Sequence, residues 1–244
     1  MADESRFSKA MIVMAHADDA EYGVSGTVAK WCSDGWDVSY VICTDGSKGS
    51  SDPNITQAEL SDIREQEQME AGKVLGLKGV VFLGYEDSLL QPTLDLRRDI
   101  AREIRKSKPD ILVCMYPMRN LDGHWGFGHP DHMASGEAAM SAVFPTARDH
   151  LTFPELIREG LETHKVSEVW IVGHPEPDHW VDVSDFIDMA AKALSQHKSQ
   201  VEHSYEKTLE LMRDWRRKTA VGKGMRYAEA YKKIVFEQPP SNDS

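Results

Sequence analysis

The chain has few cysteines and no long apolar run. Its 244 residues include three cysteines, Cys32, Cys43 and Cys114, and none of them belongs to a CxxC pair. An odd number without framework spacing predicts reduced thiols in a reducing compartment. No stretch holds 18 apolar residues, and the N-terminus lacks a basic segment followed by an apolar one. We therefore expect neither a membrane span nor a signal peptide, and the cytoplasm is the expected location.

Positive charge is also scarce, and no glycine-rich loop follows the first apolar run. Lys and Arg number 28 against 40 Asp and Glu, which gives a net charge of −12. A surface of this sign repels nucleic-acid phosphates and anionic membranes, so neither is expected as a partner. The first apolar run is followed by HADDAEYG, which contains no glycine before Gly23. A dinucleotide-binding protein would carry GxGxxG at this place, so a phosphate cradle is not expected here.

Short apolar runs alternate with amphipathic stretches over the first 173 residues. The runs predict buried strands at 10–15, 37–43, 79–85, 110–116 and 167–173, and the stretches predict helices at 23–34, 56–76, 93–107 and 130–144. Thr56 and Glu59 form a capping-box pattern, and Gly76 marks the end of that helix. Alternation of this kind predicts an α/β fold with a Rossmann-like, doubly wound, mostly parallel sheet and helices on both faces.

The pattern changes after residue 173. We expect a short strand, then a helix capped by Asp182 or Ser184 that runs to about residue 200, a polar helix to about 218 and a final strand at 233–237. Residues 238–244 have the composition of a disordered tail. No internal repeat interrupts the chain. Residues 1–244 are therefore predicted to be one domain, with the C-terminal third from about 174 as an appendage to it.

Two clusters of metal-ligating residue types follow predicted strands. His16, Asp18 and Asp19 come after the first strand, and HPDH at 129–132 comes after the fourth. Ligands of open α/β sheets bind at the carboxyl ends of the strands, and the first and fourth strands can be neighbours where the strand order reverses. His16 and Asp19 could converge from one turn on a cation, with a third ligand from the second cluster.

A site with two histidines and one carboxylate leaves coordination positions open for water and substrate. A bound cation would acidify that water. Asp18 could then act as general base and return the proton to a leaving amine. His129, oriented and kept protonated by Asp131, could stabilise a developing oxyanion.

These motifs carry a family resemblance. HADDAE resembles the AHPDDxE motif of the LmbE-like (PIG-L) zinc deacetylases, and HPDH resembles their HxDH motif. Three further segments are similar to segments of that family, namely IREQE at 63–67, FLGYEDSLL at 82–90 and ALSQHKSQV at 193–201. The resemblance covers nearly the whole chain in the right order. One departure is Ala17, which stands where the family usually has proline and is not a ligand position.

The resemblance implies hydrolysis of an N-acyl group, usually acetyl, from an N-acetylglucosamine-type sugar or glycoside. It implies one Zn²⁺ per chain, or Fe²⁺, and a homo-oligomer that is often a hexamer in short members. Carried over by position, the metal ligands are His16, Asp19 and His132, and the catalytic residues are Asp18 as general base with His129 and Asp131 as oxyanion histidine and its carboxylate. The substrate-binding residues are Arg64 and Asp87.

Each of these residues has a simpler alternative. Asp18 and Asp131 could merely cap the helices that follow them. Arg64 could form a solvated ion pair with Glu67, and Asp87 could be a turn residue. His197 is expected on a helix surface, away from the strand ends.

The function has rivals as well. A thiol–sugar conjugate amidase of the same fold would use the same site. A non-catalytic sugar- or nucleotide-binding module would not require a free base beside metal ligands. A metal-dependent phosphoesterase would usually bring more carboxylates for a second metal.

Overall fold

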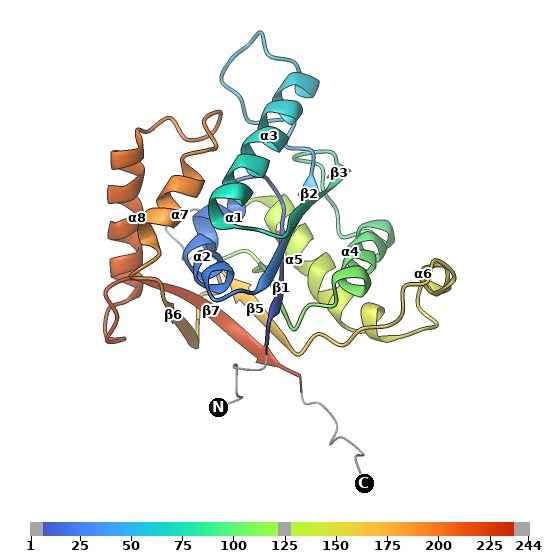
Figure 1. Ribbon diagram of the computed structural model, residues 1–244. Coiled ribbons are helices and arrows are strands. Elements are labelled where there is room, and N and C mark those ends of the chain that lie inside the picture. The colour runs from blue at the N-terminus through green and yellow to red at the C-terminus, as the bar shows by residue number, and fades with distance from the viewer. Residues whose placement is uncertain (1–6, 122–127, 237–244) are drawn as a thin grey trace.

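The computed structural model describes residues 7–121 and 128–236, and Figure 1 shows their arrangement. The tail predicted at 238–244 lies outside these residues. Within them the chain forms one sheet of seven strands in the order β3-β2-β1-β4-β5-β7-β6. The strands are β1 (Lys9–Met14), β2 (Asp37–Thr44), β3 (Gly79–Tyr85), β4 (Ile111–Met115), β5 (Glu168–Val172), β6 (His179–Asp182) and β7 (Ala228–Val235).

The sheet is mostly parallel. β3, β2, β1, β4 and β5 run parallel, whereas β7 pairs antiparallel with β5 and with the edge strand β6. Strand β1 is buried on both faces, because Met11 and Val13 pack into one apolar core while Ile12 and Met14 pack into the other. The predicted Rossmann-like, doubly wound fold is confirmed.

Helices cover both faces of the sheet (Figure 1). On one face lie α4 (Leu94–Ser107) and α5 (Pro130–Val143), followed by a 3-10 turn (Thr146–Arg148) and the short α6 (Pro154–Arg158). On the other face lie α1 (Asp19–Gly23), α2 (Ser25–Ser33), α3 (Gln57–Leu75) and α7 (Ile187–Leu194), with α8 (Tyr205–Thr219) packed on α7. None of the helices described has the length and apolar character needed to cross a bilayer.

Local signals predicted the first two thirds of the chain well. The capping box of Thr56 and Glu59 is present, and Gly76 ends α3 in the left-handed conformation. The predicted cap of the helix after residue 182 is wrong. Asp182 accepts hydrogen bonds from Ser184 instead, α7 begins only at Ile187, and it ends at Leu194 rather than near residue 200.

The carboxyl ends of β1 and β4 are neighbours, so the two motif clusters meet at one edge of the sheet. The two strands pair directly, with Val13 opposite Cys114. Helix α5 packs closely against the end of β4, because Gly136 leaves room there. A Cβ atom at this position would lie 2.2 Å from the Met115 carbonyl oxygen. This close packing fixes the N-terminus of α5, which carries the second cluster.

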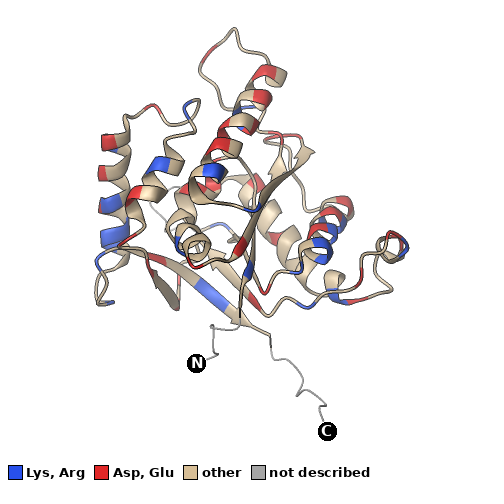
Figure 2. Cartoon of the chain, in the orientation of Figure 1, with Lys and Arg blue, Asp and Glu red and all other residues tan. Residues whose placement is uncertain are grey.

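A buried ion pair ties the C-terminal part to α2. Glu229 accepts from the backbone amides of Gly26 and Thr27 at 3.0 and 2.8 Å, and from Arg216 Nη2 at 3.0 Å. Arg216 and Glu229 are each 2 % exposed. Figure 2 shows that many other charges lie along the helices, among them α8, where acidic residues begin the helix and basic residues end it.

We expect Glu229→Ala to destabilise the whole chain. The substitution leaves the Arg216 charge buried and unpaired, a loss of about 3–5 kcal/mol in the free energy of unfolding. Denaturant unfolding followed by circular dichroism measures it. In the control, Glu210→Ala removes an exposed partner of Lys207 and should cost at most about 1 kcal/mol. Separate unfolding of the C-terminal part in Glu229→Ala would contradict the single-domain prediction.

Candidate active site

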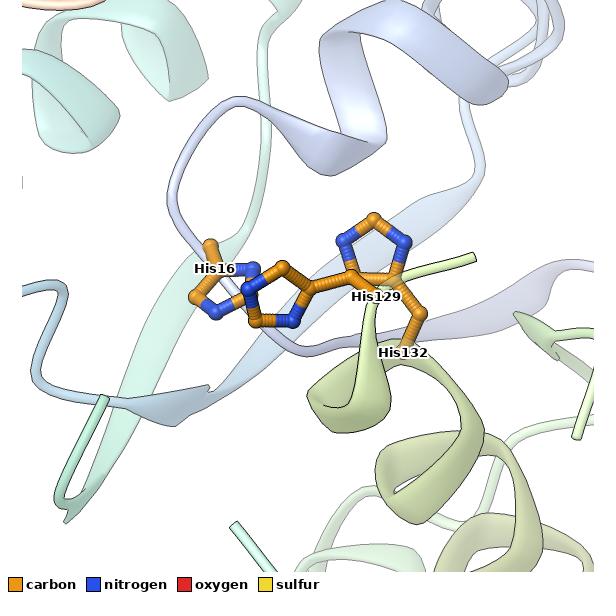
Figure 3. A group of neighbouring side chains, drawn as sticks. All are labelled: His16, His129 and His132. Carbon is orange, nitrogen blue, oxygen red and sulfur yellow. The ribbon is translucent and has the colours of Figure 1, made fainter. Parts of the chain in front are cut away.

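Three histidines from the two clusters converge at the edge of the sheet (Figure 3). His16 follows β1, while His129 and His132 stand at the start of α5. The ring centroids of His16 lie 4.8 Å from His129 and 5.4 Å from His132. His16 is buried, whereas the side chains of His129 and His132 are 39 % and 32 % exposed. One side of the group is therefore open to solvent.

Asp19 lies between two of these histidines. Its Oδ1 is 3.1 Å from His132 Nε2, and its Oδ2 is 3.4 Å from His16 Nδ1. The same Oδ2 accepts from the His16 backbone amide at 2.8 Å, which closes the turn between β1 and α1. In a tetrahedral zinc site with bonds of about 2.0–2.1 Å, the donor atoms are about 3.3 Å apart. His16, Asp19 and His132 supply the nitrogen and carboxylate donor types that such an ion takes.

The other ring nitrogen of His16 faces two further carboxylates. His16 Nε2 lies 3.2 Å from Asp87 Oδ1 and 3.2 Å from Asp131 Oδ2. Asp131 Oδ2 also accepts from the Ser88 backbone amide at 2.7 Å, while its Oδ1 is buried without a hydrogen-bond partner among the described residues. Asp87 and Asp131 are 3 % and 0 % exposed. Among the described residues, two groups have donor atoms close enough together to hold a metal, namely His16 with Asp87 and Asp131, and His16 with His129 and His132.

These carboxylates set the charge of the cluster. Burial lowers the pKa of His16, but hydrogen bonds with Asp131, Asp19 and Asp87 outweigh burial and raise it to about 11. Burial raises the pKa of Asp19, and the charge and hydrogen bond of His132, together with His16, outweigh this and lower it. The site is thus a group of carboxylates whose negative charge is balanced by a proton on His16. A divalent cation can take the place of that proton.

Asp18 stands beside this group and outside it. Burial, together with the charge of Asp19, raises the pKa of its carboxyl to about 7, although Arg64 and His197 act in the opposite direction. Asp18 precedes α1 with a φ of 91°, and within the described residues its side chain makes no capping hydrogen bond. The alternative of a mere helix cap is therefore wrong for Asp18.

His129 differs from the expectation in how it is held. The Asp131 carboxylate approaches its Nδ1 only to 4.0 Å, and the Asp131 backbone amide donates to that nitrogen at 3.2 Å. His129 is thus the N-cap of α5, and Asp131 does not cap the helix. Burial and the nearby His16 and His132 lower the pKa of His129. Because Nδ1 accepts a hydrogen bond, the proton of the neutral ring is on Nε2.

Arg64 is a buried residue of α3 and makes no solvated pair with Glu67. It is 5 % exposed, and it donates to the carbonyl oxygens of Ala17, Gly46 and Lys48 at 2.9, 3.3 and 3.2 Å. The alternative of a surface ion pair is therefore wrong. Arg64 holds the Ala17 carbonyl in the turn where the family usually has proline. It also lines a cavity of about 100 Å³ together with Ala17 and Gly46.

Arg64 also links two of the carboxylates. Its guanidinium lies 3.7 Å from Asp18 Oδ1 and 3.6 Å from Asp87 Oδ2. Asp87 occupies a turn, as its alternative predicted, and at the same time belongs to the His16 cluster. Burial raises the pKa of Asp87, but the hydrogen bond and charge of His16 outweigh burial and lower it to about 2.

The sequence did not reveal three buried polar residues next to Asp18. Glu21, Gln68 and His197 are each 0 % exposed, so the expected surface position of His197 is wrong. Burial lowers the pKa of His197, but its hydrogen bond to Glu21 raises it overall. A signal existed, since Glu21 ends the first motif and His197 lies in the segment 193–201. Neither segment indicated that these residues would be in contact.

Comparison with known proteins places this geometry in context. A family model described as "PIG-L: GlcNAc-PI de-N-acetylase" matches residues 11–143, more than half of the chain. A diacetylchitobiose deacetylase of Thermococcus kodakarensis is 32 % identical over 225 residues, which cover 91 % of this chain and 81 % of that protein. A mycothiol S-conjugate amidase of Streptomyces coelicolor is 29 % identical over 64 % of this chain and 57 % of its own length.

A solved structure shares the whole fold. The N,N'-diacetylchitobiose deacetylase of Pyrococcus horikoshii, complexed with its inhibitor MPG, superposes with a TM-score of 0.86 at 26 % sequence identity. The match covers 98 % of this chain and 90 % of that one. The likeness therefore includes the C-terminal part that lies beyond the family model.

Proposed function

The chain belongs to the PIG-L family of GlcNAc-PI de-N-acetylases, and from this membership we propose that it removes the acetyl group from an N-acetylglucosamine-type sugar or glycoside. The observation that carries the proposal is the position of Asp18. This carboxylate lies next to a convergent His16, Asp19 and His132 group without joining it. A binding module has no use for a free base at this place.

We assign the metal to His16, Asp19 and His132, as one Zn²⁺ or Fe²⁺ per chain. The residues of the rival group, His16, Asp87 and Asp131, are all buried, whereas a catalytic ion needs an accessible position. Asp87 and Asp131 instead accept from the Nε2 side of His16, which orients the ring. When bound, such a cation lowers the pKa of a water ligand and polarises the amide carbonyl.

Asp18 and His129 have different roles in the reaction. Asp18 takes a proton from the attacking water and returns it to the amine that leaves. His129 donates from Nε2–H to the oxygen of the tetrahedral acyl carbon, because its Nδ1 is occupied by the Asp131 amide. Asp131 positions the His129 ring through its own backbone amide and the His16 ring through its carboxylate. Arg64 and Asp87 hold the loops, and their contact with the sugar stays a prediction.

We expect His129→Asn to lower kcat by about 10²–10³-fold with little change in KM, the usual loss for one oxyanion donor. Asparagine can still cap α5, so the helix keeps its N-terminal hydrogen bond. Steady-state amine release measures the effect. In the control, His150→Asn replaces a histidine that is 74 % exposed and should leave kcat unchanged. An increase in KM alone would contradict the oxyanion role.

The preferred substrate distinguishes the proposed deacetylase from the rival conjugate amidase. We expect amine release from N-acetylglucosamine, its glycosides or diacetylchitobiose to exceed release from a thiol–sugar S-conjugate. The assay labels free amines and quantifies acetate in the same sample. A preference for the S-conjugate, with no acetate formed, would replace the deacetylase by the amidase. The homo-oligomer and the cytoplasmic location stay predictions.

A further inference from the structure

A network of buried, hydrogen-bonded polar side chains connects the Asp18 turn with the segment after α7. Gln68 Nε2 donates to Glu21 Oε1 at 3.1 Å, and Glu21 Oε2 lies 3.2 Å from His197 Nε2. At the other end, Gln68 Oε1 accepts from the Asp18 backbone amide at 3.2 Å. The three side chains come from α1, α3 and the turn that follows α7, and none is exposed.

Stability alone does not account for this network of buried polar side chains. Apolar residues of similar volume often stabilise a protein as well as a buried charged pair does, or better. Each buried polar group also becomes costly once a partner is lost. The buried network instead fixes the orientation of its side chains, because each hydrogen bond constrains the next residue.

The network fixes the orientation of one peptide group, the one between Ala17 and Asp18. Gln68 accepts from the Asp18 amide, and Arg64 Nη2 donates to the Ala17 carbonyl at 2.9 Å. These two groups belong to the same peptide bond, and the two side chains stand one turn apart on α3. Both edges of the 17–18 peptide are therefore held by one helix.

The held peptide sets the conformation of Asp18. A φ of 91° is disfavoured for a residue with a Cβ atom, so it persists only where the surroundings impose it. Rotation about φ of Asp18 starts from the 17–18 peptide plane. Fixing this plane thus fixes the direction in which the Asp18 carboxylate leaves the turn.

We infer that Gln68, Glu21 and His197 are positioning residues that hold Asp18 in its catalytic orientation. His197 anchors Glu21, Glu21 orients the Gln68 amide, and Gln68 holds the Asp18 amide. The C-terminal segment thereby becomes part of the base's support. The inference rests on the proposed function insofar as Asp18 is the general base.

The first test is Gln68→Met, which keeps the volume and removes the amide. We expect kcat for amine release to fall by about tenfold to a hundredfold, because a base displaced by about 1 Å loses that much, with KM and metal content within about twofold. The matched control is Gln66→Met, the same change on the exposed side of the same helix. It removes the hydrogen bond to Glu70 and should leave kcat within about twofold. A normal kcat in Gln68→Met with a lowered Tm would overturn the inference.

The second test separates position from bulk at His197. His197→Leu should lower kcat like Gln68→Met, and His197→Gln should restore most of it, because its amide can still donate to Glu21. Equal kcat in the two variants would count against a positioning role of the buried network. If His197→Leu does not fold, the comparison of Gln68→Met with Gln66→Met decides.

A structural readout separates this inference from the proposed function. If the unaltered, metal-loaded protein releases no amine from any acylated sugar, the proposed function fails. The crystal structure of Gln68→Met then tests the inference without an assay. A changed φ at Asp18 supports it, and an unchanged Asp18 conformation overturns it.

Discussion

Asp18→Asn is expected to lower kcat by about 10²–10⁴-fold while the protein keeps its metal, since that is the usual contribution of a general base. Asparagine has nearly the shape of aspartate but cannot take a proton. Asp18 lies outside the His16, Asp19 and His132 group, so removal of its charge leaves the ligand atoms in place. Amine release and metal analysis are measured on the same sample.

The same variant should alter the pH profile. The base must be deprotonated to act, so the rate of the unaltered enzyme rises with pH through the pKa of Asp18. Burial and Asp19 raise that pKa to about 7 in the protein without metal, and a bound cation lowers it. The acidic limb should thus lie below about pH 7, and it should be absent in Asp18→Asn.

The control for this prediction is Asp62→Asn. Asp62 is an exposed carboxylate on α3, close in sequence to Arg64, and its loss should leave kcat and the pH profile unchanged. If Asp18→Asn retained kcat, or if it lost metal together with kcat, Asp18 would be a structural residue or a ligand rather than the base.

Asp19→Asn is expected to lose the bound metal and all measurable turnover, whereas Asp87→Asn and Asp131→Asn keep about one metal per chain at saturating metal. All three changes replace a carboxylate by an amide of the same shape. Only Asp19 lies between His16 Nδ1 and His132 Nε2, so only its loss removes a proposed ligand. For Asp87 and Asp131 the expected cost is about 10–100-fold in affinity or activity, as for residues that orient a ligand.

Metal analysis after dialysis against a defined Zn²⁺ concentration gives the result. Binding should tighten with rising pH, because His16 must give up the proton that the three carboxylates hold on it. His132→Ala provides a second test, since it belongs to the proposed ligands and not to the rival group. Metal retained in Asp19→Asn and His132→Ala, but lost in Asp87→Asn and Asp131→Asn, would move the ion to the rival group.

The sequence was informative where local signals decide structure. Apolar runs and a capping box predicted β1 to β5 and α3. The strand-end position of both motifs indicated that they could meet, and β1 and β4 do pair directly. His16 and His132 are far apart along the chain, yet both follow parallel strands of one sheet. The topology of such sheets therefore allows the sequence to indicate that the two histidines can meet.

The sequence was uninformative where contacts between distant segments decide. His197 has a local pattern typical of a surface helix, but its partner Glu21 lies 176 residues away. Spacing likewise suggested that the Asp131 carboxylate holds His129, whereas the N-terminal geometry of α5 directs its backbone amide to that ring instead. Burial of Arg64 depends on three carbonyl groups in two loops, one after β1 and one after β2, which no helical periodicity encodes.

The most direct test is a titration of metal-free protein with Zn²⁺ in which bound metal and amine release from diacetylchitobiose are measured in the same samples. The account predicts that amine and acetate appear in equal amounts, in proportion to bound metal, up to about one ion per chain. Amine release that is independent of metal would contradict the assigned site. Stoichiometric metal with no amine released from any N-acetylglucosamine compound would contradict the deacetylase function itself.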